Sequence, residues 1–160
     1  FFKILKNKKD YLRFFTRIGP EAISKDFNKT YLSKILKNRN KNIKNLLLDQ
    51  KLVSGLGNIY VNEILYQAKI NPFKKSHLID LDENKRIIKY SKIILKKAIH
   101  FGGSSIRDFK GITGKSGNFQ SEFKVYDREE KRCSRNKCSG LIRRKIISNR
   151  STFMCTVCQK

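Results

Sequence analysis

Four cysteines near the C-terminus constrain the fold of this chain more than any other feature. They form one pair with four intervening residues and one with two, and sixteen residues separate the pairs: Cys133, Cys138, Cys155 and Cys158. Thiolates on two tight turns at this spacing can surround a zinc ion as a tetrahedron. Disulfides or unrelated free thiols are the alternatives, but the sequence shows no secretory signal. We therefore predict one structural Zn²⁺ whose four protein ligands leave no open coordination position.

The segment between the cysteine pairs is predicted to be a β-hairpin. Residues 141–147 and 150–154 are its two strands, and Ser148 and Asn149 form the turn. A hairpin closed by four cysteines is a zinc ribbon. The segment that leads into it is predicted to be strand-like, with the side chains of Phe119, Phe123, Val125 and Tyr126.

A second constraint is the stretch from Leu46 to Tyr66, which predicts a helix-turn-helix. Two apolar helical patterns, one over residues 44–50 and one opening at Asn58, flank a glycine-rich turn over residues 54–57. We predict Asn58 as the N-cap of the second helix. A helix N-terminus offers unpaired N–H donors and a partial positive charge, which suit a phosphate oxygen. The alternative is that Asn58 merely caps its own helix.

The net charge indicates a polyanionic partner. The chain has 37 lysines and arginines against 13 acidic residues, a net charge of +24 and a pI near 10.2. Nucleic acid is the first candidate for this partner. A membrane surface is the competitor, but no apolar run is long enough to span a bilayer. Compositional drift toward lysine, asparagine and isoleucine explains part of the excess.

The remaining patterns predict a mainly α fold with small β elements. A helix over residues 26–37 has Asn28 or Thr30 as its cap, and the helix that opens at Asn58 ends at 71–72, an Asn-Pro pair. The longest helix is predicted over residues 81–100, with a capping box at its start and two glycines after its end. Residues 11–18 are predicted to form a strand or hairpin.

Three isolated titratable residues are predicted to be structural. His77 and His100 have no second ligand or nucleophile at a useful spacing, so both are expected at the surface or in packing. Glu63 is a lone carboxylate, which is a poor general acid-base catalyst. We expect it to hold the neighbouring turn through hydrogen bonds.

The segment LDQKLVSGLGNIYVNE, residues 48–63, resembles the helix–two-turn–helix (H2TH) signature of bacterial formamidopyrimidine-DNA glycosylases. The four cysteines fit this family, although its first pair more usually has two intervening residues. Residues 149–155, NRSTFMC, resemble the family's closing motif. The resemblance implies a β-sandwich remnant over residues 1–18, an H2TH DNA-binding domain over 19–118 with a lesion-capping loop over 102–118, and a zinc finger over 119–160.

The resemblance also implies which residues meet damaged double-stranded DNA. In this family, the arginine at the position of Arg150 binds the phosphates beside the lesion and is assigned to the second elimination step. Arg150 is therefore the catalytic candidate. The DNA-binding candidates are Arg39, Lys44, Asn58, Arg107 and Arg150. Arg39, Lys44, Asn58 and Arg150 are expected to form one basic face across which DNA lies.

The activity implied by the resemblance is base excision of oxidised purines, 8-oxoguanine and formamidopyrimidines, followed by strand nicking through β,δ-elimination. The family uses an N-terminal proline as nucleophile, and this chain starts with Phe1, so we expect it to be a fragment that binds DNA without catalysing excision. A related endonuclease VIII-type enzyme for oxidised pyrimidines, or a non-catalytic zinc-ribbon module, is the alternative. We expect a monomer in the bacterial cytoplasm, associated with the nucleoid and not with a membrane.

Overall fold

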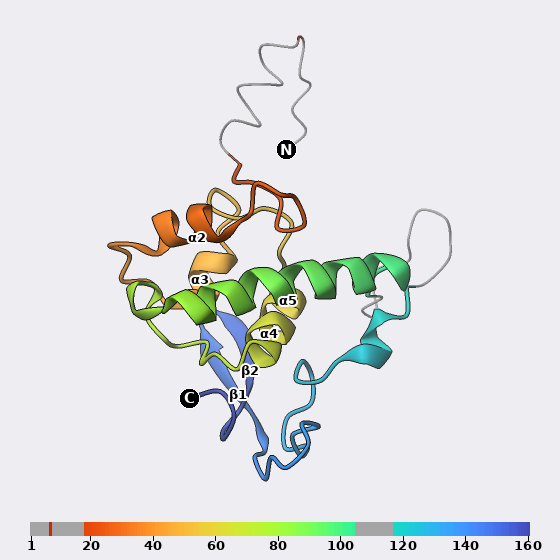
Figure 1. Ribbon diagram of the computed structural model, residues 1–160. Helices are drawn as coiled ribbons and strands as arrows, with labels where there is room; N and C mark the ends of the chain where they lie inside the picture. The colour runs from red at the N-terminus through yellow and green to blue at the C-terminus, as the bar shows by residue number, and fades with distance from the viewer. Residues whose placement is uncertain (1–6, 8–17, 105–116) are drawn as a thin grey trace.

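The computed structural model describes residue 7 and residues 18–104 and 117–160, which form a mainly helical fold with one two-stranded antiparallel sheet (Figure 1). The predicted strand at residues 11–18 lies outside this part apart from its last residue. Among the described residues, no helix is both long and apolar enough to cross a membrane. The elements are α2 (Lys29–Leu36), α3 (Ile43–Leu47), α4 (Asn58–Gln67), η1 (Ser76–Leu78), α5 (Leu81–His100), η2 (Phe119–Glu122), β1 (Ile142–Ile147) and β2 (Arg150–Cys155).

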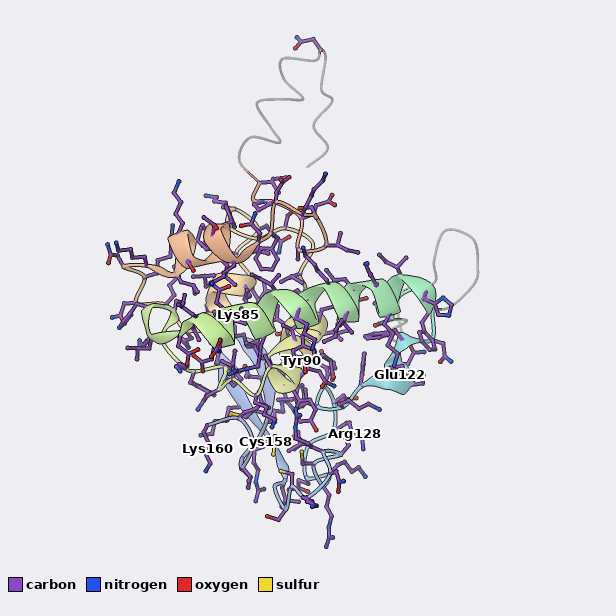
Figure 2. All side chains as sticks on the ribbon, in the orientation of Figure 1. Lys85, Tyr90, Glu122, Arg128, Cys158 and Lys160 are labelled. Carbon is purple, nitrogen blue, oxygen red and sulfur yellow. The ribbon has the colours of Figure 1, made fainter. Side chains whose placement is uncertain are left out.

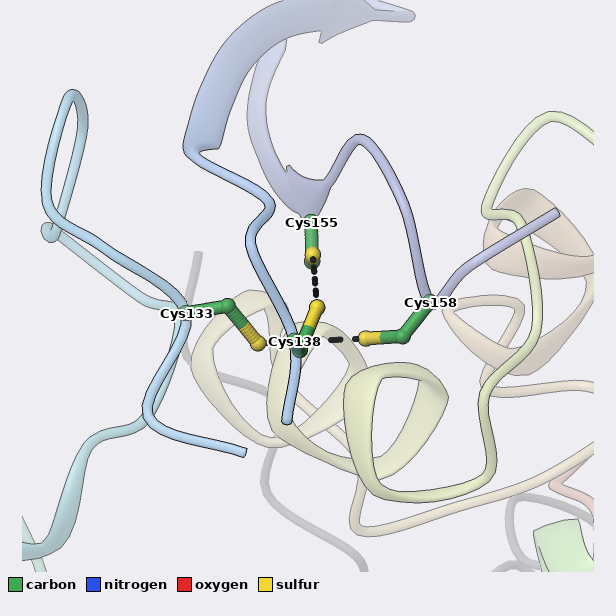
Figure 3. A group of neighbouring side chains, drawn as sticks. All are labelled: Cys133, Cys138, Cys155 and Cys158. Atoms are coloured by element: carbon green, nitrogen blue, oxygen red, sulfur yellow. Dashed lines mark hydrogen bonds between the residues drawn. The ribbon is translucent and has the colours of Figure 1, made fainter. Parts of the chain in front are cut away.

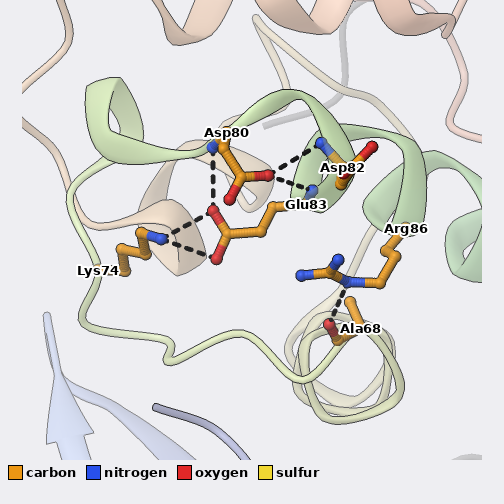
Figure 4. Close-up of polar contacts among 6 residues, drawn as sticks. All are labelled: Ala68, Lys74, Asp80, Asp82, Glu83 and Arg86. Carbon is orange, nitrogen blue, oxygen red and sulfur yellow. Dashed lines mark hydrogen bonds and ion pairs between the residues drawn. The ribbon is translucent and has the colours of Figure 1, made fainter.

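The longest helix, α5, has the predicted bounds because both of its ends are capped. The Asp80 carboxylate accepts hydrogen bonds from the N–H groups of Asp82 and Glu83, and the Glu83 carboxylate accepts one from the Asp80 N–H (Figure 4). Lys74 pairs with Glu83 at 2.7 Å and fixes this end. At the other end Gly102 takes a φ of 72°, a left-handed conformation that stops the helix.

The helices α2 and α3 are shorter than predicted, because local side chains set the start of α2 and the end of α3. Helix α2 begins at Lys29 because the Asn28 side chain accepts a 3.0 Å hydrogen bond from the Tyr31 N–H, which confirms Asn28 as the cap. Helix α3 ends at Leu47 because Gln50 belongs to the following turn. Its side-chain oxygen accepts from the Gly55 N–H at 3.0 Å, and its amide nitrogen donates to the Leu56 carbonyl at 2.9 Å.

Helix α4 ends at Gln67, before the predicted stop at the Asn-Pro pair. Lys69 takes a left-handed φ of 58°, so the chain leaves the helix two residues after its last turn. The Arg86 guanidinium of α5 donates a 2.9 Å hydrogen bond to the Ala68 carbonyl (Figure 4). This bond satisfies one of the carbonyl groups that a helix C-terminus leaves without an internal partner.

The buried apolar side chains form two clusters. The larger joins the four helices, with Leu32, Leu46, Ile64 and Ile87 fully buried. Each such side chain contributes about 1.5–3 kcal/mol by leaving water. The smaller cluster lies under the hairpin and is built from Tyr66, Val125, Cys133, Ile142, Phe153 and Cys155. Tyr66 belongs to α4, so this helix takes part in both clusters.

The segment before the first cysteine pair is not the predicted strand. Residues Phe119–Glu122 form η2, and the backbone N–H groups of residues 124–126 donate to the Glu63 carboxylate at 2.8–3.1 Å. A buried carboxylate with several donors can hold a loop without a neighbouring strand. Glu63 is therefore structural as predicted, but it holds this segment and not the H2TH turn.

Positive charge is spread over the surface and is not confined to one patch. Lysine and arginine side chains project from the helices and from the hairpin, with Lys85 on α5 and Lys160 beyond the cysteines as labelled examples (Figure 2). The charge alone therefore does not locate a binding site, and local geometry has to do so.

Candidate nucleic-acid interface and metal centre

The four predicted zinc ligands meet in one cluster. Their sulfur atoms all lie within 4.8 Å of one another, with 3.9 Å between Cys133 and Cys158 and 3.6 Å between Cys138 and Cys155 (Figure 3). A disulfide would bring two sulfurs to about 2.05 Å. Zinc–sulfur bonds of about 2.3 Å in a tetrahedron put neighbouring sulfurs ~3.8 Å apart. The four thiols thus fit a tetrahedral metal centre, and the wider first pair does not prevent its closure.

The hairpin and one glycine bring the second half of the cluster into place. Cys155 ends β2 opposite Ile142 in the antiparallel register. A Cβ added at Gly140 would lie only 2.5 Å from the Cys155 sulfur, so no other residue fits there without displacing a ligand. In the first pair, Lys137 takes a left-handed φ of 58°, which turns the chain back so that Cys138 faces Cys155.

The hairpin turn places Arg150 beside the N-terminus of α4. Ser148 and Asn149 have φ values of 47° and 60°, the two left-handed residues of a type I′ turn, as the sequence predicted for the hairpin turn. Arg150 follows directly, pairs with Ile147 and is exposed. The carbonyl of the next residue, Ser151, accepts a 3.1 Å hydrogen bond from the side-chain amide of Asn58.

Asn58 is the first residue of α4 and not its N-cap, which corrects the prediction. The N-cap is Gly57, with φ −103° and ψ 175°, and none of the described side chains caps the helix. The Asn58 side chain is used instead for the bond to Ser151 on the hairpin. The N–H groups at the start of a helix have no partner inside it, so this end of α4 can accept an outside anion.

The turn before α4 contains two glycines, and the structure explains them differently. Gly55 has a φ of 81°, which a residue with a side chain rarely adopts. Gly57 has an ordinary φ, and a Cβ added there would meet no described atom within 4 Å. The protein's own packing therefore does not require glycine at Gly57. A bare backbone at this position leaves the helix N-terminus open to close approach from outside.

Lys44 lies beneath the hairpin and not on an exposed basic face, which corrects its predicted position. Its side chain is fully buried, and its ammonium nitrogen donates to the Ser151 carbonyl at 2.8 Å and to the Thr152 hydroxyl at 2.7 Å. Burial, together with a smaller effect of the positive charge of Arg150, lowers the pKa of Lys44 to about 8. Lys44 and Asn58 thus hold the same carbonyl group, one residue from Arg150.

The contact of the hairpin with α3 and α4 at the Ser151 carbonyl is called the junction below. The other two predicted DNA contacts are not part of it. Arg39 lies half-buried in the loop before α3, where its carbonyl accepts hydrogen bonds from the His77 N–H and ring. No contact in the described ranges joins Arg39 to Lys44, Asn58 or Arg150. Arg107 lies outside the described residues. Their roles remain predictions.

Comparison with known proteins identifies the family to which this arrangement belongs. A family model described as the formamidopyrimidine-DNA glycosylase H2TH domain matches residues 18–110, more than half of the chain. The chain belongs to the formamidopyrimidine-DNA glycosylase family. A formamidopyrimidine-DNA glycosylase of Prochlorococcus marinus subsp. pastoris is 43% identical over 143 residues, which are 89% of this chain and 48% of that protein.

Solved structures of the family show the same fold. A mutant of the Lactococcus lactis Fpg in complex with DNA containing Fapy-dG has a TM-score of 0.87 and 37% identity, over 96% of this chain and 56% of that one. The complex of Lactococcus lactis Fpg with DNA containing an abasic site gives the same values, 0.87, 37%, 96% and 56%. This family member therefore spans about half the length of the relatives it matches.

Sequence reasoning missed two residues, Asn62 and Asn45, that connect the helices of this glycosylase-family chain to its hairpin. Asn62 is fully buried, its side-chain oxygen accepts a 2.8 Å hydrogen bond from the Phe153 N–H, and its amide donates to the Asn58 carbonyl at 2.7 Å. The available signal was a polar residue four positions after Asn58, on the same face of the helix. Asn45 makes a smaller contact of the same kind, donating to the Ser148 hydroxyl at 2.9 Å.

Proposed function

We propose that this chain is the DNA-binding C-terminal part of a base-excision-repair glycosylase with AP lyase activity. The parent protein excises oxidised purines, 8-oxoguanine and formamidopyrimidines, from double-stranded DNA and nicks the strand by β,δ-elimination. Family membership supports this proposal, as do the relatives' printed names and complexes, which concern formamidopyrimidine-DNA glycosylases and DNA with Fapy-dG or an abasic site.

The single observation that carries the proposal is the shared acceptor at Ser151. Asn58 at the start of α4 and Lys44 in α3 both donate to this carbonyl, so the backbone next to the exposed Arg150 is held near an open helix N-terminus. One phosphate can accept N–H bonds from the helix while Arg150 binds a neighbouring phosphate. Such contacts fix the position of the strand and carry no sequence information.

The residues have separate roles in this proposal. Arg150 and Asn58 bind the backbone of the lesion-containing strand from the hairpin and from the helix, and Arg150 also assists the second elimination. Lys44 acts from below by positioning the hairpin. Arg39 and Arg107 extend the contact surface. The domain division is proposed as residues 1–18, 19–118 and 119–160.

The metal centre is proposed to hold one structural Zn²⁺. Its four cysteine thiolates would complete the coordination shell, so the ion supplies folding free energy to the hairpin and no reactive position. The hairpin carries Arg150, so the metal supports the DNA contact indirectly. We further propose that the protein acts as a monomer in the bacterial cytoplasm.

Binding to DNA with and without a lesion tests the proposal. The affinity of this chain for a duplex with an abasic-site analogue is compared with that for the intact duplex at several salt concentrations. Loss of affinity with salt is common to all basic DNA-binding proteins, whereas preference for the analogue is specific to repair. Equal affinity for both duplexes would favour a non-catalytic zinc-ribbon module.

Catalysis is tested on the same chain by borohydride trapping. We expect no covalent adduct with abasic DNA, because the resemblance assigns the nucleophile to a part of the family architecture that these 160 residues do not match. A trapped adduct would show that a residue of this chain forms the Schiff base. With the parent protein, excision of paired purine and pyrimidine lesions separates the oxidised-purine enzyme from the endonuclease VIII-type alternative.

A further inference from the structure

Tyr66 joins helix α4 to the cysteine cluster through its hydroxyl group. Its side chain is almost fully buried, and its hydroxyl oxygen lies 3.1 Å from the Cys133 sulfur and 3.3 Å from the Ser134 hydroxyl. A tyrosine hydroxyl is protonated at neutral pH and can donate a hydrogen bond. A thiolate at Cys133 would accept this hydrogen bond.

Arg135 contacts the same tyrosine through its ring and its backbone. Its guanidinium lies over the Tyr66 ring, 5.1 Å from the centroid, and donates a 3.0 Å hydrogen bond to the Tyr66 carbonyl. Ser134 and Arg135 are two of the four residues between the first pair of cysteines. The wider first pair thus supplies the residues that contact α4, and Tyr66 contacts both this loop and a metal ligand.

The charge of the metal centre gives these contacts a chemical role. Four thiolates around one divalent ion leave a net charge of about −2 at a site where two of the cysteines are buried and two are partly buried. Hydrogen bonds to the sulfurs stabilise that charge, and loss of such an outer partner commonly lowers metal affinity 10–100-fold. At Cys133 the Tyr66 hydroxyl is placed for this role, together with the backbone N–H of Arg135.

We propose that Tyr66 is a positioning residue of the metal centre, which donates a hydrogen bond to the Cys133 thiolate and slows metal loss. This inference rests on the zinc site of the proposed function. Helix α4 carries Asn58 at its first residue and Tyr66 near its last, so one helix connects the DNA-contact junction with a metal ligand. The metal centre is thereby fixed to the H2TH helices as well as to its own hairpin.

The test compares Tyr66→Phe with Tyr126→Phe. Tyr126 packs in the same cluster with its ring 5.0 Å from that of Phe153, and within the described chain no contact joins its hydroxyl to a cysteine. Zinc transfer to an excess of a coloured chelator is followed for each protein. We expect Tyr66→Phe to release zinc about 10–100-fold faster and Tyr126→Phe to stay within about twofold of the wild type.

A cobalt-substituted protein separates a hydrogen bond to sulfur from simple packing. Losing the donor raises the energy of the thiolate electrons, so the sulfur-to-cobalt charge-transfer band should move to lower energy in Tyr66→Phe, while the d–d bands stay tetrahedral. Unchanged band energy and unchanged zinc release in folded Tyr66→Phe would overturn the inference. If the purified wild-type protein contained no zinc, the zinc proposal would fail, and this inference would fail with it.

Discussion

The ammonium nitrogen of Lys44 donates a 2.8 Å hydrogen bond to the carbonyl oxygen of Ser151, 107 positions later in the chain. Lys44 belongs to α3 and Ser151 to β2, so this bond fixes the hairpin to the H2TH helices. The cation has two oxygen acceptors and no described carboxylate partner, and it lies near the positive charge of Arg150. Burying the protonated Lys44 ammonium group costs free energy, and the neutral amine does not carry this cost.

The first prediction concerns the pH dependence that Lys44 adds to stability. Its pKa is 10.5 in an ordinary environment and about 8 in the folded protein. Between these two pH values the unfolded chain binds more protons, so the free energy of unfolding rises with pH. Lys44→Met removes this contribution. Denaturant unfolding at steps from pH 7 to pH 10.5 should therefore show the wild type gaining stability relative to the variant.

The control for this comparison is Lys41→Met. Lys41 is exposed and pairs with Asp49 at 3.3 Å, so its substitution should leave the difference from wild type nearly constant over the same pH range. Parallel pH profiles for the wild type and Lys44→Met would show that Lys44 is not buried as a cation. The same variant should also weaken DNA binding, because the hairpin that carries Arg150 loses one of its two bonds at Ser151.

The second prediction separates the two glycines of the H2TH turn. Gly57→Ala places a methyl group in open space at the start of α4 and should leave the free energy of unfolding nearly unchanged. It should lower affinity for the abasic-analogue duplex about tenfold, or ~1.4 kcal/mol, by keeping a phosphate from the helix N–H groups. Titration by fluorescence anisotropy, together with thermal unfolding, measures both effects.

Gly55→Ala is the matched variant and should behave in the opposite way. Its φ of 81° puts an alanine in the left-handed region, which should destabilise the protein by about 1 kcal/mol. Its DNA affinity should stay near that of the wild type while the protein is folded. If Gly57→Ala bound DNA as tightly as Gly55→Ala, the open N-terminus of α4 would not contact the phosphate.

Features set by neighbouring residues could be predicted from the sequence. The capping box before α5, the Asn28 cap and the hairpin turn at Ser148 and Asn149 all depend on a few adjacent positions. The cysteine cluster was predicted from spacing alone, because four thiolates have few other ways to be used together. The resemblance to the H2TH signature led to the family.

Features set by distant segments could not be predicted. The burial of Lys44 depends on where β2 lies, and a lysine in a basic chain gives no local sign of it. Asn62 has a partner 91 positions away at Phe153. The aromatic residues from Phe119 onward favour a strand by composition, but the Glu63 carboxylate accepts the backbone N–H groups of residues 124–126, which a strand would use for pairing.

The third prediction concerns Arg150, the catalytic and DNA-binding candidate. Arg150→Ala removes an exposed side chain, so the hairpin should remain folded with its metal bound. Affinity for lesion-containing duplex should fall, and the slope of log affinity against log salt should decrease by about 1 as one phosphate contact is lost. Arg143→Ala is the control, because Arg143 is exposed on the same hairpin but far from the turn. Equal salt slopes for both variants would remove Arg150 from the interface.

The fourth prediction tests whether the metal holds the hairpin separately from the helices. Cys155→Ser removes a ligand at the end of β2 and should release zinc and unfold the hairpin, since metal binding supplies its folding free energy. The helical circular dichroism should persist, because the larger cluster contains no cysteine. DNA affinity should fall at least as far as in Arg150→Ala, because Arg150 loses its position. The neighbouring Thr156→Ser should keep zinc and affinity. If Cys155→Ser kept one zinc per chain, measured by mass spectrometry of the native protein, the four-cysteine site would be refuted.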